Sequence, residues 1–188
     1  MNGKMILLLG DTHIPDRVTE LPRQLKSFVE CTRFDFILST GDLTSQVVLS
    51  WMQKMAPLKV VKGNMDYLFL PEEETLHLPP FKIGLIHGTG IWPRGDTKQL
   101  LKVAKRLDAN VLVSGHTHRP EITLSEGVLL LNPGSLTGAW GGSSDWGSPS
   151  LITLSISEKE VRVHLFVLEK ELKRKEEIFK IKSGEIVS

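Results

Sequence analysis

The sequence predicts an α/β protein, and three observations carry that prediction. Short apolar runs alternate with segments whose apolar residues recur at helical spacing. The first three runs each end in a glycine followed by a polar residue, as Gly10-Asp11, Gly41-Asp42 and Gly63-Asn64. The length of 188 residues allows about 70% of the unfolded surface to be buried in one core. Strand–helix alternation of this kind indicates a parallel sheet with right-handed crossovers.

The bulk composition limits the class of protein. The chain suits a single domain over residues 1–188, without a linker or an internal repeat. A net charge of +1 argues against a broad nucleic-acid or membrane surface. The single cysteine, Cys31, excludes an internal disulfide framework and is expected to be a small buried residue just after the first helix. No run resembles a signal peptide or a membrane span, so we expect a soluble cytoplasmic protein with no membrane partner.

The first third of the chain is expected to contain three strands separated by two helices. The strands are expected over residues 5–9, 34–38 and 58–61. Apolar residues at helical spacing predict the first helix around residues 21–29, with Asp16 or Thr19 as candidate caps. The second helix follows a cap at Thr44 or Ser45. Its buried stripe is expected to consist of Val47, Val48, Trp51, Met52 and Met55.

The rest of the chain mixes strands with one further helix. Strands are expected over residues 75–78, 81–86, 111–113, 122–124, 128–131, 151–156 and 161–168. Pro79-Pro80 suits a hairpin between the first two of these strands. A helix capped by Asp96 or Thr97 carries apolar residues from Leu100 to Leu107. The charged segment 169–181 fits either a helix or a last strand, and we favour the strand.

Polar side chains gather at the ends of the predicted strands. The set consists of Asp11, His13, Asp42, Asn64, His87, His116 and His118. Each residue alone has an ordinary explanation, because an aspartate after a strand often caps a turn and a lone histidine is often a core residue. Together these residues need a different explanation, since turns and helix caps require no His-x-His pair. Parallel strands would bring several of these ends to one rim of the sheet.

This set of donors is typical of a two-metal hydrolase. Imidazole, carboxylate and amide ligands without a thiolate suit Mn²⁺, Fe²⁺, Co²⁺, Ni²⁺ or Zn²⁺. Seven ligands exceed the needs of one tetrahedral ion but fit two ions that share a carboxylate. Two neighbouring ions commonly activate water for attack on phosphorus. We therefore expect two divalent ions, with Mn²⁺ favoured, and hydrolysis of a phosphate ester.

The same residues resemble the five motif blocks of the calcineurin-like metallophosphoesterases, in family order. The blocks are Gly10-Asp11-x-His13, Gly41-Asp42, Gly63-Asn64-x-Asp66, His87-Gly88 and Gly115-His116-x-His118, and Asn132-Pro133-Gly134-Ser135 extends the match to the small phosphodiesterase branch. The resemblance implies an αββα fold, in which a sandwich of two sheets is flanked by helices. It also implies one metal held by Asp11, His13 and His118, a second held by Asn64, His87 and His116, and a bridge made by Asp42.

The function implied is that of a metal-dependent phosphodiesterase. Its substrate would be a phosphodiester, either a small molecule or a nucleotide. Water activated by the two metals would attack phosphorus, with Asp42, Asn64 and His87 acting directly at the reacting phosphate. A homo-oligomer is compatible with this function.

A second likeness leaves an alternative function open. Residues 10–15, 81–88 and 132–139 resemble the metallophosphoesterase-like small subunit of the retromer coat, which is chiefly a scaffold for a larger helical partner. That likeness implies a protein partner and a weak or vestigial metal site. The chain keeps Asp42 and Asn64, where that relative has lost the family pattern. Because function follows the site rather than the fold, the enzyme is favoured.

Further details concern the leaving group and the loops. Many family members place a histidine after the asparagine of the third block, where it can protonate a leaving group, but this chain has Met65. General-acid help is worth about 10²–10⁴-fold, so diesters with good leaving groups should suffer least. Asp66 could orient an imidazole at position 65.

Trp92, Trp140 and Trp146 are expected to pack within their loops, with base stacking or a partner patch as alternatives.

Overall fold

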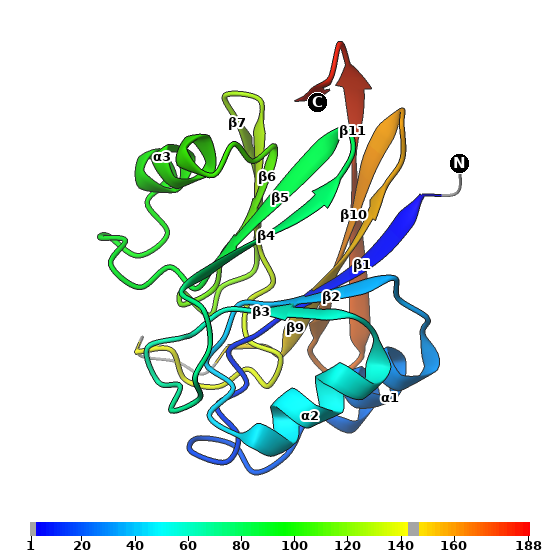
Figure 1. Cartoon of the computed structure of the whole chain (residues 1–188). Coiled ribbons are helices and arrows are strands. Elements are labelled where there is room, and N and C mark those ends of the chain that lie inside the picture. The colour runs from blue at the N-terminus through cyan, green and yellow to red at the C-terminus, as the bar shows by residue number, and fades with distance from the viewer. Residues whose placement is uncertain (1–2, 143–146) are drawn as a thin grey trace.

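The computed structural model describes residues 3–142 and 147–188, which form two β-sheets and three helices (Figure 1). The first sheet contains β1 (Lys4–Leu9), β2 (Phe36–Ser39), β3 (Leu58–Val60), β9 (Ser150–Ile156), β10 (Glu160–Leu168), β11 (Leu172–Lys182) and β12 (Glu185–Val187). Its strand order is β12-β11-β10-β9-β1-β2-β3. The second sheet contains β4 (Glu73–Leu78), β5 (Phe81–Ile86), β6 (Val111–Val113), β7 (Glu121–Ser125) and β8 (Val128–Asn132), in the order β4-β5-β6-β8-β7.

The alternation of side chains along the strands produces three layers of apolar packing. Ile6 and Leu8 of β1 belong to the core between the two sheets, together with residues of β5, β6 and β8. Leu7 and Leu9 point to the opposite face of the first sheet, where they meet α1 (Arg23–Cys31) and α2 (Gln46–Met55). The strand β1 is therefore buried on both faces. This arrangement confirms the expected sandwich of two sheets.

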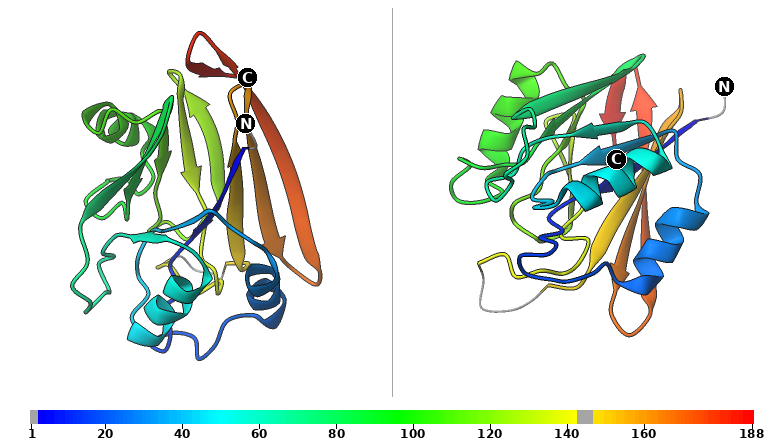
Figure 2. Two further views of the ribbon diagram at one scale, coloured as in Figure 1. Left: turned by 45° about the vertical axis from the view of Figure 1, so that its right-hand side comes forward. Right: turned by 60° about the horizontal axis from the view of Figure 1, so that its bottom comes forward.

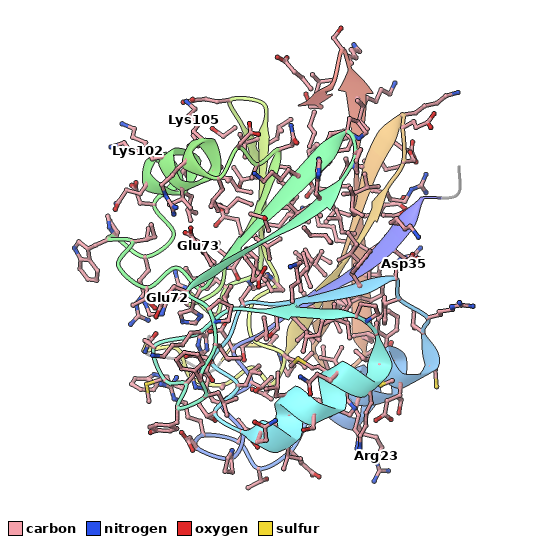
Figure 3. All side chains as sticks on the ribbon, in the orientation of Figure 1. Arg23, Asp35, Glu72, Glu73, Lys102 and Lys105 are labelled. Carbon is pink, nitrogen blue, oxygen red and sulfur yellow. The ribbon has the colours of Figure 1, made fainter. Side chains whose placement is uncertain are left out.

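The helix α3 (Thr97–Arg106) covers the outer face of the second sheet. Leu100, Leu101 and Ala104 pack against residues of β5, β6 and β8. Asp96 caps the helix by accepting a hydrogen bond from the Gln99 backbone amide at 2.9 Å. The exposed Lys102 and Lys105 project from the other side of α3 (Figure 3). Helices thus lie on both outer faces, as the two turned views also show (Figure 2).

Two parallel sets of strands bring the loops of interest to one edge. In the first sheet β1, β2 and β3 run parallel, and in the second sheet β5, β6 and β8 run parallel. The loops after β1, β2, β3, β5 and β6 carry the seven polar residues that the sequence singled out. The Nδ1 atom of His87, after β5, lies 2.7 Å from the Thr40 carbonyl after β2, so the two sheets meet at this edge.

Several sequence expectations need correction. Cys31 is the last residue of α1 and is exposed, because α1 turns Leu25 and Val29 to the sheet instead. Val47 is 77% exposed, and Leu49 takes its place in the buried face of α2 beside Val48 and Met52.

The structure agrees only in part with the expected helix caps and the expected C-terminal strand. Pro22 occupies the N-cap position of α1, and no side chain caps this helix, so neither Asp16 nor Thr19 serves as its cap. Ser45 caps α2, as expected. The segment 169–181 is mostly strand β11, which confirms the favoured alternative, and the short β12 was not expected. In the described part of the chain, no helix is both long and apolar enough to cross a membrane.

Candidate metal centre

The loops of the candidate centre have an unusual backbone. Five residues have φ between 48° and 68°, in the left-handed region that side chains disfavour. These residues are Asp11, His13, Asp42, His116 and His118. Such conformations persist only where the surrounding structure enforces them, and they gather at functional sites. The strain here coincides with the residues that carry polar donors.

Four of the seven residues form a compact buried cluster, which we call the inner group. It consists of Asp11, His13, Asp42 and His118. Each offers one donor atom, and these atoms all lie within 4.8 Å of one another. The Nε2 atoms of His13 and His118 are 3.1 Å apart, and His118 Nε2 is 3.2 Å from Asp11 Oδ1. All four side chains are buried, so the inner group is shielded from bulk water.

The other three residues form a second cluster, the outer group of Asn64, His87 and His116. His87 Nε2 lies 3.1 Å from Asn64 Oδ1 and 3.2 Å from His116 Nδ1. His87 is buried, whereas His116 is half-buried and Asn64 is exposed. The outer group is therefore the side of the centre that opens to solvent.

Asp42 lies between the two groups. Its Oδ1 atom accepts a hydrogen bond from the Met65 backbone amide at 2.7 Å. Its Oδ2 atom is 3.4 Å from His13 Nε2 and 3.5 Å from His87 Nε2. One oxygen of a single carboxylate thus faces both the inner and the outer group.

Backbone carbonyls orient two of the imidazoles. His87 Nδ1 is 2.7 Å from the Thr40 carbonyl oxygen, and His118 Nδ1 is 2.7 Å from the Ala139 carbonyl oxygen. When Nδ1–H donates to a carbonyl, the Nε2 lone pair is left facing the centre. This arrangement is the usual support for a histidine that binds a metal.

The buried carboxylate of Asp66 ties two of the loops together. It accepts hydrogen bonds from four backbone amides, those of Asp42, Leu43, Thr44 and Gly63, at 2.8–2.9 Å. Asp66 therefore joins the loop after β2 to the loop after β3. The expectation that Asp66 could orient an imidazole at position 65 needs correction, because both oxygens already serve the backbone.

The segment after β8 closes the centre from the other side. Ser135 Oγ donates to the Asp11 carbonyl at 2.7 Å, and Thr137 Oγ1 donates to the Thr12 carbonyl at 2.9 Å. Asn132 Nδ2 donates to the Gly115 carbonyl at 3.0 Å. The Asn-Pro-Gly-Ser block thus holds the first and last motif loops in place.

Burial and neighbouring charges shift the pKa values of the centre. Burial, reinforced by the charge of Arg17, lowers the pKa of His13 to about 3, and burial with the nearby His87 and Arg94 lowers that of His116 to about 4. Both imidazoles are neutral at pH 7 and keep their lone pairs. Burial is the largest influence on Asp11 and opposes its ionisation, yet the hydrogen bond to His118 and the neighbouring imidazoles together hold the pKa of this carboxyl below its usual range. Burial is also the largest influence on His118 and lowers its pKa, but the hydrogen bond and charge of Asp11, together with the Ala139 carbonyl, raise that pKa above its usual value.

This set of donors fits a divalent cation. Imidazoles and carboxylates converge on a buried volume, and converging acceptors of this kind are stable when a positive charge lies between them. Among the described residues, His13 Nδ1 is the one buried side-chain polar atom without a hydrogen-bond partner. The other nitrogen, Nε2, faces the inner group, where it lies 3.1 Å from His118 Nε2 and 3.4 Å from Asp42 Oδ2.

Two arginines that the sequence reasoning missed lie beside the centre. Arg17 Nη1 is 3.4 Å from His13 Nε2, and it donates to the Trp140 carbonyl, with the guanidinium 5.6 Å from the Trp140 ring centroid. Arg94 Nη1 donates to the Gly141 carbonyl at 2.6 Å. Neither arginine stands in a glycine-rich motif, so no local sequence signal marked them.

The three loop tryptophans have different outcomes. Trp140 is 44% exposed, and its ring lies against Arg17 of the loop after β1, which differs from the expected packing within its own loop. Trp92 is 79% exposed, which overturns the expectation that it packs within its own loop. Trp146 lies outside the described residues.

Comparison with known proteins identifies the family. A model of the calcineurin-like phosphoesterase superfamily domain matches residues 5–159. A probable metallophosphoesterase of Methanocaldococcus jannaschii is 44% identical over 138 residues, 73% of this chain and 71% of that protein. Vacuolar Protein Sorting 29 from Cryptosporidium parvum has a TM-score of 0.92 and 27% identity over 96% of this chain and all of its own. Vps29 from Entamoeba histolytica, in complex with Zn²⁺, has a TM-score of 0.87 and 32% identity over 93% of this chain and 98% of its own. The chain belongs to the calcineurin-like phosphoesterase superfamily.

Proposed function

We propose that the protein is a metal-dependent phosphodiesterase that uses two divalent ions. The observation that carries the proposal is the position of Asp42, whose Oδ2 atom faces both the inner and the outer group. The inner group would hold one ion, and the outer group with Asp42 would hold the other. When bound, such ions supply an activated water and neutralise the charge on phosphoryl oxygens. Mn²⁺ is the favoured ion, because the donors are nitrogen and oxygen without thiolate.

The chain's own residues would prepare the site for a phosphate. Asp42 holds the two groups in register, and the backbone amide of Met65 keeps its carboxylate from rotating. Asn64 is exposed at the open side, where its amide can donate to a phosphoryl oxygen. His87 is fixed by the Thr40 carbonyl, and its Nε2 atom lies 3.1 Å from Asn64 Oδ1. These three residues are the proposed catalytic residues.

The expected preference for esters with acidic leaving groups rests on position 65. Met65 is half-buried and has no acidic proton, so the protein offers no imidazole there to protonate a leaving group. Diesters with acidic leaving groups need that proton least. We therefore expect aryl phosphodiesters to be hydrolysed faster than alkyl phosphates.

Metal content and hydrolysis, measured on the same preparation, test the proposal. Protein stripped with a chelator and reloaded with Mn²⁺ should bind two ions per chain by elemental analysis. It should hydrolyse bis(4-nitrophenyl) phosphate only when loaded, and 4-nitrophenyl phosphate more slowly. Binding of two ions without hydrolysis of any ester would contradict the enzyme, and failure to bind metal would contradict the site as well.

A second candidate function is a scaffold subunit of a retromer-like assembly. It is supported by the likeness to Vacuolar Protein Sorting 29, which extends over 96% of this chain. In that case the endogenous protein should migrate in cell extract with a larger protein partner. The complex should persist after Asp42→Ala, because the contact would not depend on metal. A protein that migrates alone or as a homo-oligomer and hydrolyses diesters would favour the enzyme.

A further inference from the structure

A pocket of about 520 Å³ opens beside the candidate metal centre. It is lined by Trp92, Arg94, Gly95, Thr117, Arg119, Glu121, Gly141 and Gly142. Thr117 stands between His116 and His118, so the same loop lines the pocket and carries members of both groups. A Cβ atom added to Gly141 would lie 2.7 Å from His118 Cγ, which places the pocket wall directly against the inner group. The pocket therefore adjoins the loop that carries His116 and His118.

The polar lining of the pocket has an excess of positive charge. Arg94 donates through Nη1 to the Gly141 carbonyl at 2.6 Å, which holds its guanidinium at the wall. Arg119 is exposed, and its guanidinium has no hydrogen bond or ion pair among the described residues. Glu121 is the opposing charge, and its Oε1 atom accepts a hydrogen bond from Thr123 Oγ1 at 2.8 Å. Two guanidinium groups against one carboxylate suit a single added phosphate better than a longer polyanion.

Trp92 gives the pocket an exposed aromatic face. Its side chain is 79% exposed, although its backbone is fixed, because Gln99 Nε2 donates to the Trp92 carbonyl at 2.6 Å. The neighbouring Gly95 lies against Thr117, since a Cβ atom there would be 3.2 Å from Thr117 Cγ2. A rigid backbone that presents an indole to solvent beside two arginines is well suited to stacking a planar base.

We propose that this pocket binds the non-reacting part of a nucleotide diester. The base stacks on Trp92, and a second phosphate lies between Arg94 and Arg119, while the diester phosphate lies at the metal centre. This proposal specifies the substrate of the proposed phosphodiesterase. It rests on that proposed function, because it assumes that the reacting phosphate lies at the metal centre. It assigns the substrate class: a nucleotide that carries one phosphate besides the diester.

Three substrates with the same leaving group test the proposal by kinetics. They are bis(4-nitrophenyl) phosphate, thymidine 5′-(4-nitrophenyl phosphate) and the 3′-phosphorylated form of the latter. The value of kcat/KM should rise in that order with the Mn²⁺-loaded protein. Trp92→Ala should reduce the preference for the two nucleotides, and Arg119→Gln should reduce the preference for the 3′-phosphate by roughly 10-fold. Arg23→Gln is the matched control, because Arg23 lies on α1 at a distance from α3 (Figure 3) and should leave the order unchanged.

Calorimetry gives a readout that is independent of turnover. Metal-stripped and dialysed protein should bind thymidine 3′,5′-bisphosphate more tightly than thymidine 5′-phosphate. Trp92→Ala should raise the Kd of the bisphosphate about 5- to 150-fold, and Arg119→Gln about 10-fold. Arg23→Gln should not change it. Circular dichroism of each variant will show that the fold is kept.

The outcomes separate the two proposals. Hydrolysis of all three substrates at equal kcat/KM, or a Kd that neither variant changes, overturns the nucleotide pocket and leaves the phosphodiesterase standing. Absence of hydrolysis with a Kd that both variants raise overturns the phosphodiesterase and supports the pocket as a nucleotide site.

Discussion

The inner and outer groups of the metal centre differ in what surrounds them. The inner group is buried, and all four of its members, Asp11, His13, Asp42 and His118, have left-handed backbone. The outer group has an exposed amide, Asn64, and a half-buried imidazole, His116. If the proposed function holds, we expect from this difference that the inner group retains an ion and that the outer group meets the substrate.

The largest expected effect comes from Asp42, which both groups share. Asp42→Ala should abolish binding of both ions and reduce hydrolysis by at least about 10³-fold, because the electrostatic contribution of such ions amounts to several kcal/mol. Elemental analysis and a diesterase assay measure the two effects. Asp35→Ala is a matched control, since Asp35 precedes β2 and Asp42 follows it (Figure 3). Two ions still bound to Asp42→Ala would show that this residue is not the bridge.

Removal of one ligand from each group tests the comparison itself. His118→Ala should empty the inner site and lower activity by about 10²-fold or more, because it also leaves Asp11 without its buried partner. Asn64→Ala should weaken only the outer ion, by about 10-fold, since a neutral exposed amide is lost. Metal titrations that follow the two binding steps will distinguish these results. Equal loss of both ions in both variants would mean that the groups do not act separately.

Asp66 provides a test of positioning without direct contact to a metal. Asp66→Asn places an NH₂ group against backbone amides that now donate to a carboxylate, so the loops after β2 and β3 should separate. We expect metal affinity to fall by about 10- to 100-fold and the thermal midpoint to decrease. Asp16→Asn, at an exposed position of the first loop, serves as the control. Unchanged metal affinity in Asp66→Asn would remove this residue from the support of the centre.

The smallest effect is expected at Met65. Met65→His introduces an imidazole near the outer group, but Asp66 is not available to orient it. The gain in rate should therefore fall below the ~10²-fold lower bound for a positioned general acid. It should be slight for a nitrophenyl diester and larger for an alkyl diester. Rates across a series of leaving groups check this, and a gain that does not depend on leaving-group basicity would show that no proton is delivered from position 65.

Much of the fold was predictable because the patterns are local. The continuous apolar run over residues 5–9 and the helical spacing around Leu25 and Leu100 correspond to β1, α1 and α3. The division into two sheets came only from the family resemblance. It depends on long-range pairing, such as the antiparallel placement of β9 beside β1, which no short window of sequence shows. Val47 was misplaced because Val48 and Leu49 give α2 an almost equivalent apolar stripe one residue on.

The candidate site was predictable in its donors but not in its support. Histidines and carboxylates at strand ends are chemically distinctive, so His116 and His118 stood out from the sequence. No sequence pattern predicts that Asp66 accepts hydrogen bonds from four backbone amides. An aspartate in a turn can accept from local or from distant amides, and the sequence does not distinguish the two cases. The exposure of Trp92 was also beyond local reasoning, since it depends on where the loop before α3 lies.

The left-handed residues of the centre also bear on how such a protein evolves. Each non-glycine residue held there costs of the order of 1–3 kcal/mol, and glycine would relieve that cost at Asp11, His13 or His116. A lineage no longer selected for hydrolysis would therefore be released from this backbone strain as glycine replaced these residues, while the two sheets stayed intact. As far as the backbone is concerned, retention of all five side chains in this chain is the more strained state.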